Sequence, residues 1–310
     1  MIELADIALA RYRLSPYLRP TPLEQIHDLG PQVWFKLENV NKTRSFKVRG
    51  ALNAMLTLNR KAREKGIIAC SSGNHAQGVA YAAHLLGTTA RVLMPTSTPR
   101  RKVEGVHQYG SQAILFGDNY DEAEDEAHRL IRDEGATFIS PYNDPLIVAG
   151  AGTIGLEIID SLPDVERVLV PVSGGGLISG VALALKSLKP SIEVIGVCAE
   201  SAPAMYNLFY DTALPQVWET LAEALSGEIE ANAITISLTQ RYVDEIVLVS
   251  EEAIAEAMRW LLLKCAWVVE GGGAVGVAAL RSGVVEEDGR STVVVLSGGN
   301  VDEETLSHLL

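Results

Sequence analysis

Short runs of β-branched and apolar residues alternate with longer segments of mixed polarity along almost the whole chain. The runs have the length of buried strands, and the segments between them show the spacing of amphipathic helices. Residues 121–133, for example, carry apolar side chains at Ala123, Ala127, Leu130 and Ile131 and charged side chains at most other positions. This alternation is typical of an α/β protein with a mainly parallel sheet. It predicts strands at residues 33–37, 66–71, 90–94, 113–116, 137–140, 168–172, 194–198, 245–249 and 292–296.

The predicted strands between residues 66 and 140 are separated by helical segments, so this block can form a small sheet of its own. We therefore predict a smaller domain, residues 64–143, inserted into a larger domain formed by residues 1–63 and 144–310. A chain of 310 residues exceeds the size at which one core usually keeps growing, which favours such a division. Because the sequence ends soon after Asn300, we expect no regulatory domain at the C-terminus.

The overall charge narrows the choice of partners. The chain has 39 acidic and 26 basic residues, a formal net charge of −13 that repels nucleic acid and anionic lipid. The longest apolar stretch, residues 260–269, is too short to span a bilayer and contains Lys264. The acidic N-terminus does not resemble a secretory signal, so we expect a cytoplasmic protein. The cysteines lack the spacing of a zinc site or a disulfide framework; they are Cys70, Cys198 and Cys265.

A lysine marks the first segment with candidate chemistry, residues 45–51 (SFKVRGA). Lys47 stands near the start of a predicted helix, for which Ser45 is the expected N-cap. The positive end of the helix dipole and burial in a cleft both lower the pKa of an amine, which makes it a nucleophile near neutral pH. Taken alone, such a lysine is more often a solvated helix residue. Arg49 is expected to be a structural ion-pair partner.

Two small-residue loops follow later strands. Residues 71–75 (SSGNH) precede a helix predicted at 79–86, and amides at such a helix start suit a carboxylate. Residues 173–177 (SGGGL) precede a helix predicted to begin near Ser179, and consecutive glycines let several N–H groups face one anion. A capping turn and a flexible turn are the plain alternatives. The second loop is neither GxGxxG nor a Walker loop, which disfavours a nicotinamide dehydrogenase.

These motifs and residues 297–300 (SGGN) occur in the order and spacing of the fold-type-II pyridoxal phosphate enzymes. Within that group the chain most resembles the threonine/serine dehydratases, which are ammonia-lyases, and serine racemase is a close relative. The resemblance extends from Thr21 to Asn300. It implies two open, mainly parallel twisted sheets flanked by helices, with pyridoxal 5'-phosphate in the cleft between the domains. It also implies a homodimer that acts on an amino acid.

The resemblance further implies a role for individual residues. Lys47 would carry the cofactor and act on the substrate's Cα proton, with Ser72 on the opposite face. Ser297 would bind the pyridine nitrogen through a hydroxyl, which does not hold that nitrogen protonated and so favours elimination over transamination. Glu270 is expected near the ring. The implied cofactor ligands are Phe46, Lys47, Asn74, Gly174, Gly175, Gly176, Leu177 and Ser297, and the implied substrate ligands are Ser71, Ser72, Gly73, Asn74 and His75.

The chain departs from the family pattern at several positions. Arg44 stands where the motif usually has glycine, and Ala151 replaces a common glutamine and is expected to remove a polar contact from the site wall. Glu200 and the carbonyl of Ala204 match the family's divalent-ion site, but Tyr206 stands where its second carboxylate belongs. Because divalent ions prefer charged oxygen ligands, we expect no divalent metal there, and a monovalent cation or none.

The sequence therefore predicts a pyridoxal phosphate lyase that converts a β-hydroxy amino acid, L-threonine or L-serine, to a 2-oxo acid and ammonia. A racemase or a hydroxyaspartate dehydratase on the same scaffold is the alternative, and chiral analysis of unreacted substrate separates them. A catalytically silent cofactor-binding protein is a second alternative, which the presence of Lys47, Ser72, Asn74 and Ser297 disfavours. From the residues alone, a Rossmann oxidoreductase is a further alternative, and nicotinamide binding would reveal it.

Overall fold

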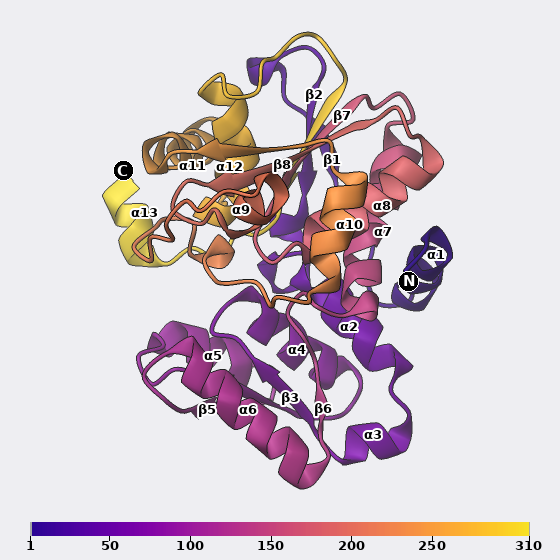
Figure 1. The fold of residues 1–310 in the computed structure, drawn as a ribbon, viewed down its shortest axis with the longest axis vertical. Coiled ribbons are helices and arrows are strands. Elements are labelled where there is room, and N and C mark those ends of the chain that lie inside the picture. Colours follow the sequence, from indigo (N-terminus) through magenta and orange to yellow (C-terminus); the bar gives the residue numbers. More distant parts are fainter. Residues whose placement is uncertain (1, 310) are drawn as a thin grey trace.

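A computed structural model describes residues 2–309 of the chain. It contains two sheets with helices packed around each, one in the larger upper part and one in the smaller lower part of Figure 1. The six-stranded sheet has the order β1-β2-β10-β7-β8-β9, and all its pairs are parallel except β1 with β2. Its strands are β1 (Leu23–Gln25), β2 (Val33–Leu37), β7 (Arg167–Pro171), β8 (Glu193–Ala199), β9 (Glu245–Val249) and β10 (Thr292–Leu296).

The smaller sheet has four parallel strands in the order β5-β4-β3-β6. They are β3 (Ile67–Cys70), β4 (Ala90–Met94), β5 (Gln112–Leu115) and β6 (Thr137–Phe138). Every strand predicted from the sequence is present, which confirms the α/β class with two mainly parallel sheets. The strand predicted at 137–140 is shorter, because β6 pairs only with Ile67 and Ile68 of β3. Strand β1 was not predicted, since three residues carry too little periodicity to be recognised.

Most helices lie between successive strands, while α1 precedes β1 and α13 follows β10. The helices are α1 (Leu4–Leu14), α2 (Lys47–Thr57), α3 (Arg60–Glu64), α4 (Asn74–Leu85), α5 (Arg100–His107), α6 (Tyr120–Glu134), α7 (Pro145–Ser161), α8 (Gly176–Leu188), α9 (Ala204–Tyr210), α10 (Ile234–Tyr242), α11 (Glu251–Cys265), α12 (Gly271–Arg281) and α13 (Glu303–Leu309). Within residues 2–309, none of them is long and apolar enough to cross a membrane.

Three predicted helix starts are wrong. Helix α4 begins at Asn74 rather than near residue 79, and α8 begins at Gly176 rather than near Ser179. The first turns of both helices line a cleft, so they lack the apolar pattern from which a helix start is read. Ser45 is not the N-cap of α2, because Phe46 holds that position and the Ser45 hydroxyl is buried without a hydrogen bond in the described residues.

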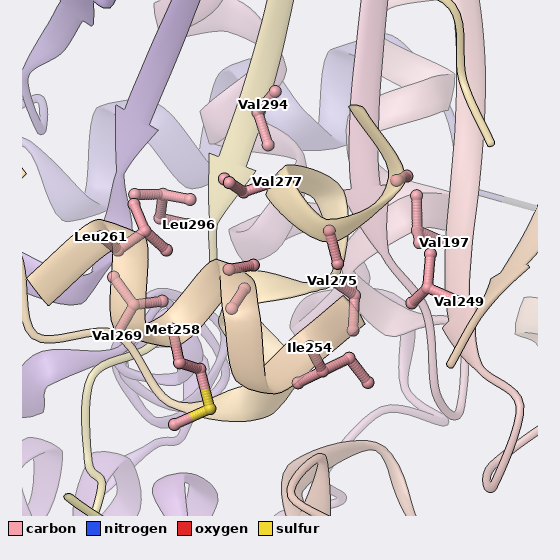
Figure 2. Close-up of a cluster of buried hydrophobic side chains, with 14 of the residues drawn as sticks. Val197, Val249, Ile254, Met258, Leu261, Val269, Val275, Val277, Val294 and Leu296 are labelled. Atoms are coloured by element: carbon pink, nitrogen blue, oxygen red, sulfur yellow. The ribbon is translucent and has the colours of Figure 1, made fainter. Parts of the chain in front are cut away.

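The core of the larger sheet has two faces, because successive residues of each strand point to opposite sides. Val294 and Leu296 of β10 join the cluster that packs under α11 and α12, shown in Figure 2. Val293 and Val295 of the same strand join the cluster under α7 and α8. The rigid double-sided sheet fixes where its strands end, and the candidate site is built on those ends.

One of the hydrophobic clusters on the smaller sheet also includes residues from outside residues 64–143. Val48, Leu52 and Met55 of α2 share one hydrophobic cluster with Ile67 of β3 and Val79 of α4. Helix α2 therefore packs between the two sheets, although the predicted boundary assigns it to the larger domain. All four strands of the smaller sheet lie within residues 64–143, and the boundary itself stays a prediction.

Candidate active site

Segments after three neighbouring parallel strands form one side of a cleft. Strands β2, β10 and β7 lie next to one another, and the chain after each leads to Lys47, Ser297 and Gly174 respectively. Strand β3 of the smaller sheet leads to residues 71–75 in the same way. All these segments line one cleft of about 1630 Å³. Crevices beyond the carboxyl ends of parallel strands are the usual ligand sites of such sheets.

Lys47 is the first residue of α2 and points into this cleft. Its Nζ donates a hydrogen bond to the carbonyl oxygen of Pro141 at 2.9 Å and lies 5.3 Å from the centre of the Phe46 ring. Burial lowers the pKa of Lys47 to about 8, and the carboxylate of Glu270 acts against this shift. With such a pKa, about a tenth of the amines are neutral at pH 7, far more than for an ordinary lysine.

Backbone hydrogen bonds tie the lysine segment to the end of β10. The N–H of Phe46 donates to the carbonyl of Ser297 at 3.0 Å, and Ser45 forms an antiparallel bridge with Gly298. The N–H of Gly299 donates to the carbonyl of Arg44 at 2.9 Å. The position of Lys47 is therefore fixed relative to Ser297 by the main chain, before any side chain contributes.

The glycine loop after β7 has no room for side chains. A Cβ atom on Gly174 would lie 2.6 Å from the ring of Tyr142, and one on Gly175 would lie 2.7 Å from Met205. Gly175 also has a φ of +84° and is the N-cap of α8, so its neighbours present their N–H groups at a helix N-terminus. Such an end attracts anions. Thr235 supports the loop, since its hydroxyl donates to the carbonyl of Gly174 at 2.7 Å.

The loop at residues 71–75 forms the opposite wall, where α4 begins. The side chains of Ser71, Ser72 and Asn74 are partly exposed to the cleft. His75 is different, because it is buried and its Nε2 donates to the carbonyl of Ile139 at 2.8 Å. Burial and the nearby charge of Lys47 lower the pKa of His75 to about 3, so its ring is neutral at pH 7. The side chain of His75 thereby tethers the loop to Ile139.

Two carboxamides and a carboxylate meet between the sheets. The Nδ2 of Asn74 donates to Oε1 of Glu270 at 2.5 Å, and the Nδ2 of Asn300 donates to Oδ1 of Asn74 at 2.7 Å. Burial raises the pKa of Glu270 to about 7, although the N–H groups of Asn74 and Asn300 lower it. Asn300 was not predicted as a site residue. Its presence in the SGGN motif was the one signal that could have identified it.

Arg44 and Ala151, two positions where the chain departs from the family pattern, lie in different surroundings. Arg44 is exposed and lines the cleft, with a φ of +56°, a left-handed conformation that glycine adopts more readily. Ala151 is buried in the apolar cluster under α7 and is not among the described residues that line the cleft. The expected loss of a polar wall contact at Ala151 therefore has no counterpart in the cleft.

Glu200, Ala204 and Tyr206 lie at the end of β8 and the start of α9. Glu200 is exposed, and the ring of Tyr206 packs against Tyr210 with 4.8 Å between their centres. In the described part of the chain, no group of three or more His, Cys, Asp or Glu side chains is placed to hold a metal ion. Among the residues that the structure describes, Glu200 therefore belongs to no such cluster.

Comparisons with known proteins agree with this geometry. Residues 14–298 match the family described as "Pyridoxal-phosphate dependent enzyme". The L-threonine ammonia-lyase of Thermotoga maritima is 42% identical, and the match covers 100% of this chain and 78% of that relative. Maize serine racemase has a similar structure, with a TM-score of 0.92, 32% identity, and coverage of 99% of this chain and 96% of that one. The structure of threonine deaminase isoform 2 of Solanum lycopersicum is also similar. Its TM-score is 0.91, with 33% identity and coverage of 99% of this chain and 91% of that one.

Proposed function

Because this chain belongs to the family of pyridoxal-phosphate dependent enzymes, we propose that it is a lyase that deaminates a β-hydroxy amino acid, L-threonine or L-serine. The observation that carries the proposal is its 42% identity, over the whole chain, to an L-threonine ammonia-lyase. The partly buried amine of Lys47, in the same cleft as a loop that suits a carboxylate, supports it. The products are a 2-oxo acid and ammonia, since the water lost with the β-hydroxyl is regained on hydrolysis.

The residues of the cleft fit pyridoxal phosphate. An aldehyde forms an imine with a neutral amine, and the lowered pKa of Lys47, about 8, makes the neutral form accessible near pH 7. A phosphate requires several N–H donors, and the loop around Gly175 leads into the N-terminus of α8 where a Cβ atom has no space. We propose that Phe46, Asn74 and Ser297 surround the ring. Leu177 and the glycines would hold the phosphate; the glycines are Gly174, Gly175 and Gly176.

Bound pyridoxal phosphate would supply an electron sink for the substrate's Cα–H bond. The protein's part is to hold the substrate and to move the proton. We propose that the N–H groups and hydroxyls of residues 71–75 bind the α-carboxylate at the start of α4. The Nζ of Lys47 would then take the Cα proton. A general base held within hydrogen-bond distance of the proton it removes contributes a factor of roughly 10²–10⁴ in rate. Ser72 would stand on the other face of the substrate.

A panel of β-hydroxy amino acids tests this function. The protein with pyridoxal phosphate is incubated with L-threonine, L-serine and 3-hydroxyaspartate, and ammonia and 2-oxo acid are measured together. We expect equal amounts of both products, highest with L-threonine or L-serine. Unreacted substrate is analysed for chirality in the same samples. Accumulation of the D-enantiomer without ammonia would make the protein a racemase, and binding of the cofactor without turnover of any substrate would make it catalytically silent.

Membership of the same family also supports a proposal for the assembly and its location. We propose a homodimer in the cytoplasm, with a monovalent cation as the only ion that the region of Glu200 would take. Light scattering should give twice the chain mass, and a monomer at micromolar concentration would contradict the dimer.

A further inference from the structure

The side chain of Asn300 has both of its amide hydrogens engaged. Its Nδ2 donates to the carbonyl oxygen of Thr43 at 2.8 Å and to Oδ1 of Asn74 at 2.7 Å. A carboxamide nitrogen carries two hydrogens and no lone pair for accepting. Turning this amide over would bring its oxygen within 2.8 Å of another oxygen that cannot donate. The orientation of Asn300 is therefore fixed by its neighbours.

The orientation of Asn74 follows from that of Asn300. Since Oδ1 of Asn74 accepts from Asn300, its Nδ2 must face the carboxylate of Glu270, where the two atoms lie 2.5 Å apart. Glu270 takes one of the two hydrogens of this nitrogen. Among the described residues no second acceptor is placed on it, so one N–H of Asn74 is left to offer to a ligand in the cleft.

The carboxylate of Glu270 occupies a closely fitted place at the start of α12. A Cβ atom on Gly298 would lie 2.1 Å from its Oε1, so only glycine leaves room for it. The side chain is buried, and it interacts electrostatically with the amine of Lys47, with Lys102 of α5 and with Glu223. Glu270 thus joins the larger sheet to Asn74, the first residue of α4 on the smaller sheet.

We propose that Glu270 and Asn300 are positioning residues that hold the Asn74 amide with its remaining N–H toward an acceptor oxygen on the ring of the bound cofactor. The proposal rests on the function proposed above, because it requires pyridoxal phosphate in this cleft. It adds two residues that act through Asn74. It also links the left-handed turn at Thr43, whose φ is +59°, to the start of α4.

A double-mutant cycle on cofactor binding tests whether these residues act through Asn74. Pyridoxal phosphate is titrated into the apo-protein of the parent, Asn74→Ala, Asn300→Asp and the double variant, and its visible absorption band is followed. The Asp side chain keeps the shape of Asn300 but removes both donors. We expect each single variant to raise the dissociation constant about 2- to 12-fold, the value of one hydrogen bond. The dissociation constant of the double variant should be no higher than that of the single variant that binds the cofactor more weakly.

Variants of Glu270 supply a second test with a conservative rescue. Glu270→Gln retains an oxygen that accepts a hydrogen bond from Asn74. It should therefore shift the wavelength of the bound cofactor's visible absorption band less than Glu270→Ala does. Glu304→Gln removes the same charge from an exposed position of α13 and should leave the band unchanged.

The outcomes separate this inference from the proposed function. Multiplicative losses in the double variant, or a parent-like band in both Asn300→Asp and Glu270→Ala, would overturn the positioning role while leaving a pyridoxal phosphate enzyme. Failure of the parent protein itself to bind pyridoxal phosphate would overturn the proposed function, and the inference with it.

Discussion

Arg49 and Glu38 form an ion pair that is closed to solvent, with 2.8 Å between Nη2 and Oε1 and at most 2% of either side chain exposed. Glu157 binds the same guanidinium and also lies 2.6 Å from Nζ of Lys36. Two cations and two carboxylates thus neutralise one another beside the start of α2. Burial opposes ionisation of Glu38, but Arg49, Lys36 and Thr21 together outweigh burial and lower the pKa of Glu38 to about 2. The ion pair expected for Arg49 is confirmed.

Removing one member of this buried cluster should be severely destabilising, because a carboxylate would remain buried without its partner. We expect Arg49→Ala to lower the free energy of unfolding by about 3–5 kcal/mol, measured by urea unfolding. The matched control is Arg11→Ala, which breaks the exposed pair of Arg11 with Asp160 and should change the same quantity by less than about 1 kcal/mol. Equal losses of unfolding free energy in the two variants would show that the buried cluster stabilises the protein no more than an exposed ion pair does.

The reactivity of Lys47 should depend on pH around its lowered pKa. Since only the neutral amine is a nucleophile, labelling of Lys47 by an amine-directed reagent in the apo-protein should rise through about pH 8. The carboxylate of Glu270 raises the pKa of Lys47, so Glu270→Gln should move this rise to lower pH. Mass spectrometry of the labelled peptides measures both, with exposed Lys61 as the internal reference. A midpoint for Lys47 near that of an ordinary lysine, about 10.4, would contradict the effect of burial.

Chelation should leave most of the activity intact. Tyr206 stands in place of a carboxylate near Glu200, and a divalent ion prefers several charged oxygen ligands. Ammonia release is measured before and after treatment with a chelator, and again after Mg²⁺ is added. A large loss that Mg²⁺ restores would show that other groups complete a divalent site.

Replacing Ser297 tests why a hydroxyl stands at that position. If Ser297 binds the pyridine nitrogen as proposed, Ser297→Asp would place a negative charge beside that nitrogen and raise its proton affinity. We expect slower ammonia release and a larger share of transamination, seen as pyridoxamine phosphate by chromatography. Ser297→Ala deletes one hydrogen bond of about 0.5–1.5 kcal/mol and should have the milder effect. The same product ratio in both variants and the parent would make Ser297 a structural residue.

Local patterns predicted the strands and the motif loops, because both depend on neighbouring residues. The run at β10 alternates Val293 and Val295 with Val294 and Leu296, and a buried strand is the structure that such a run favours. The glycine loops after strands could be predicted equally well, because a backbone that approaches an anion closely favours glycine. The resemblance to a known family then supplied the cofactor.

Contacts between distant segments could not be predicted in this way. Asn300 meets Thr43 and Asn74 across 257 and 226 residues of sequence, and no local pattern encodes those distances. The same limit explains why α2 was assigned to one domain although it packs against both α7 of the larger part and α4 of the smaller part. Ala151 was expected near the cleft and lies in an apolar cluster, because the turn of α7 that it occupies faces the larger sheet.

The most direct test is to identify the lysine that carries the cofactor. The protein is loaded with pyridoxal phosphate, reduced with borohydride, digested and analysed by mass spectrometry. We expect the pyridoxyl group on Lys47 alone, and a Lys47→Ala variant that takes up the cofactor reversibly through the glycine loop but releases no ammonia. A pyridoxyl group on any other lysine, or unchanged ammonia release by Lys47→Ala, would contradict the account.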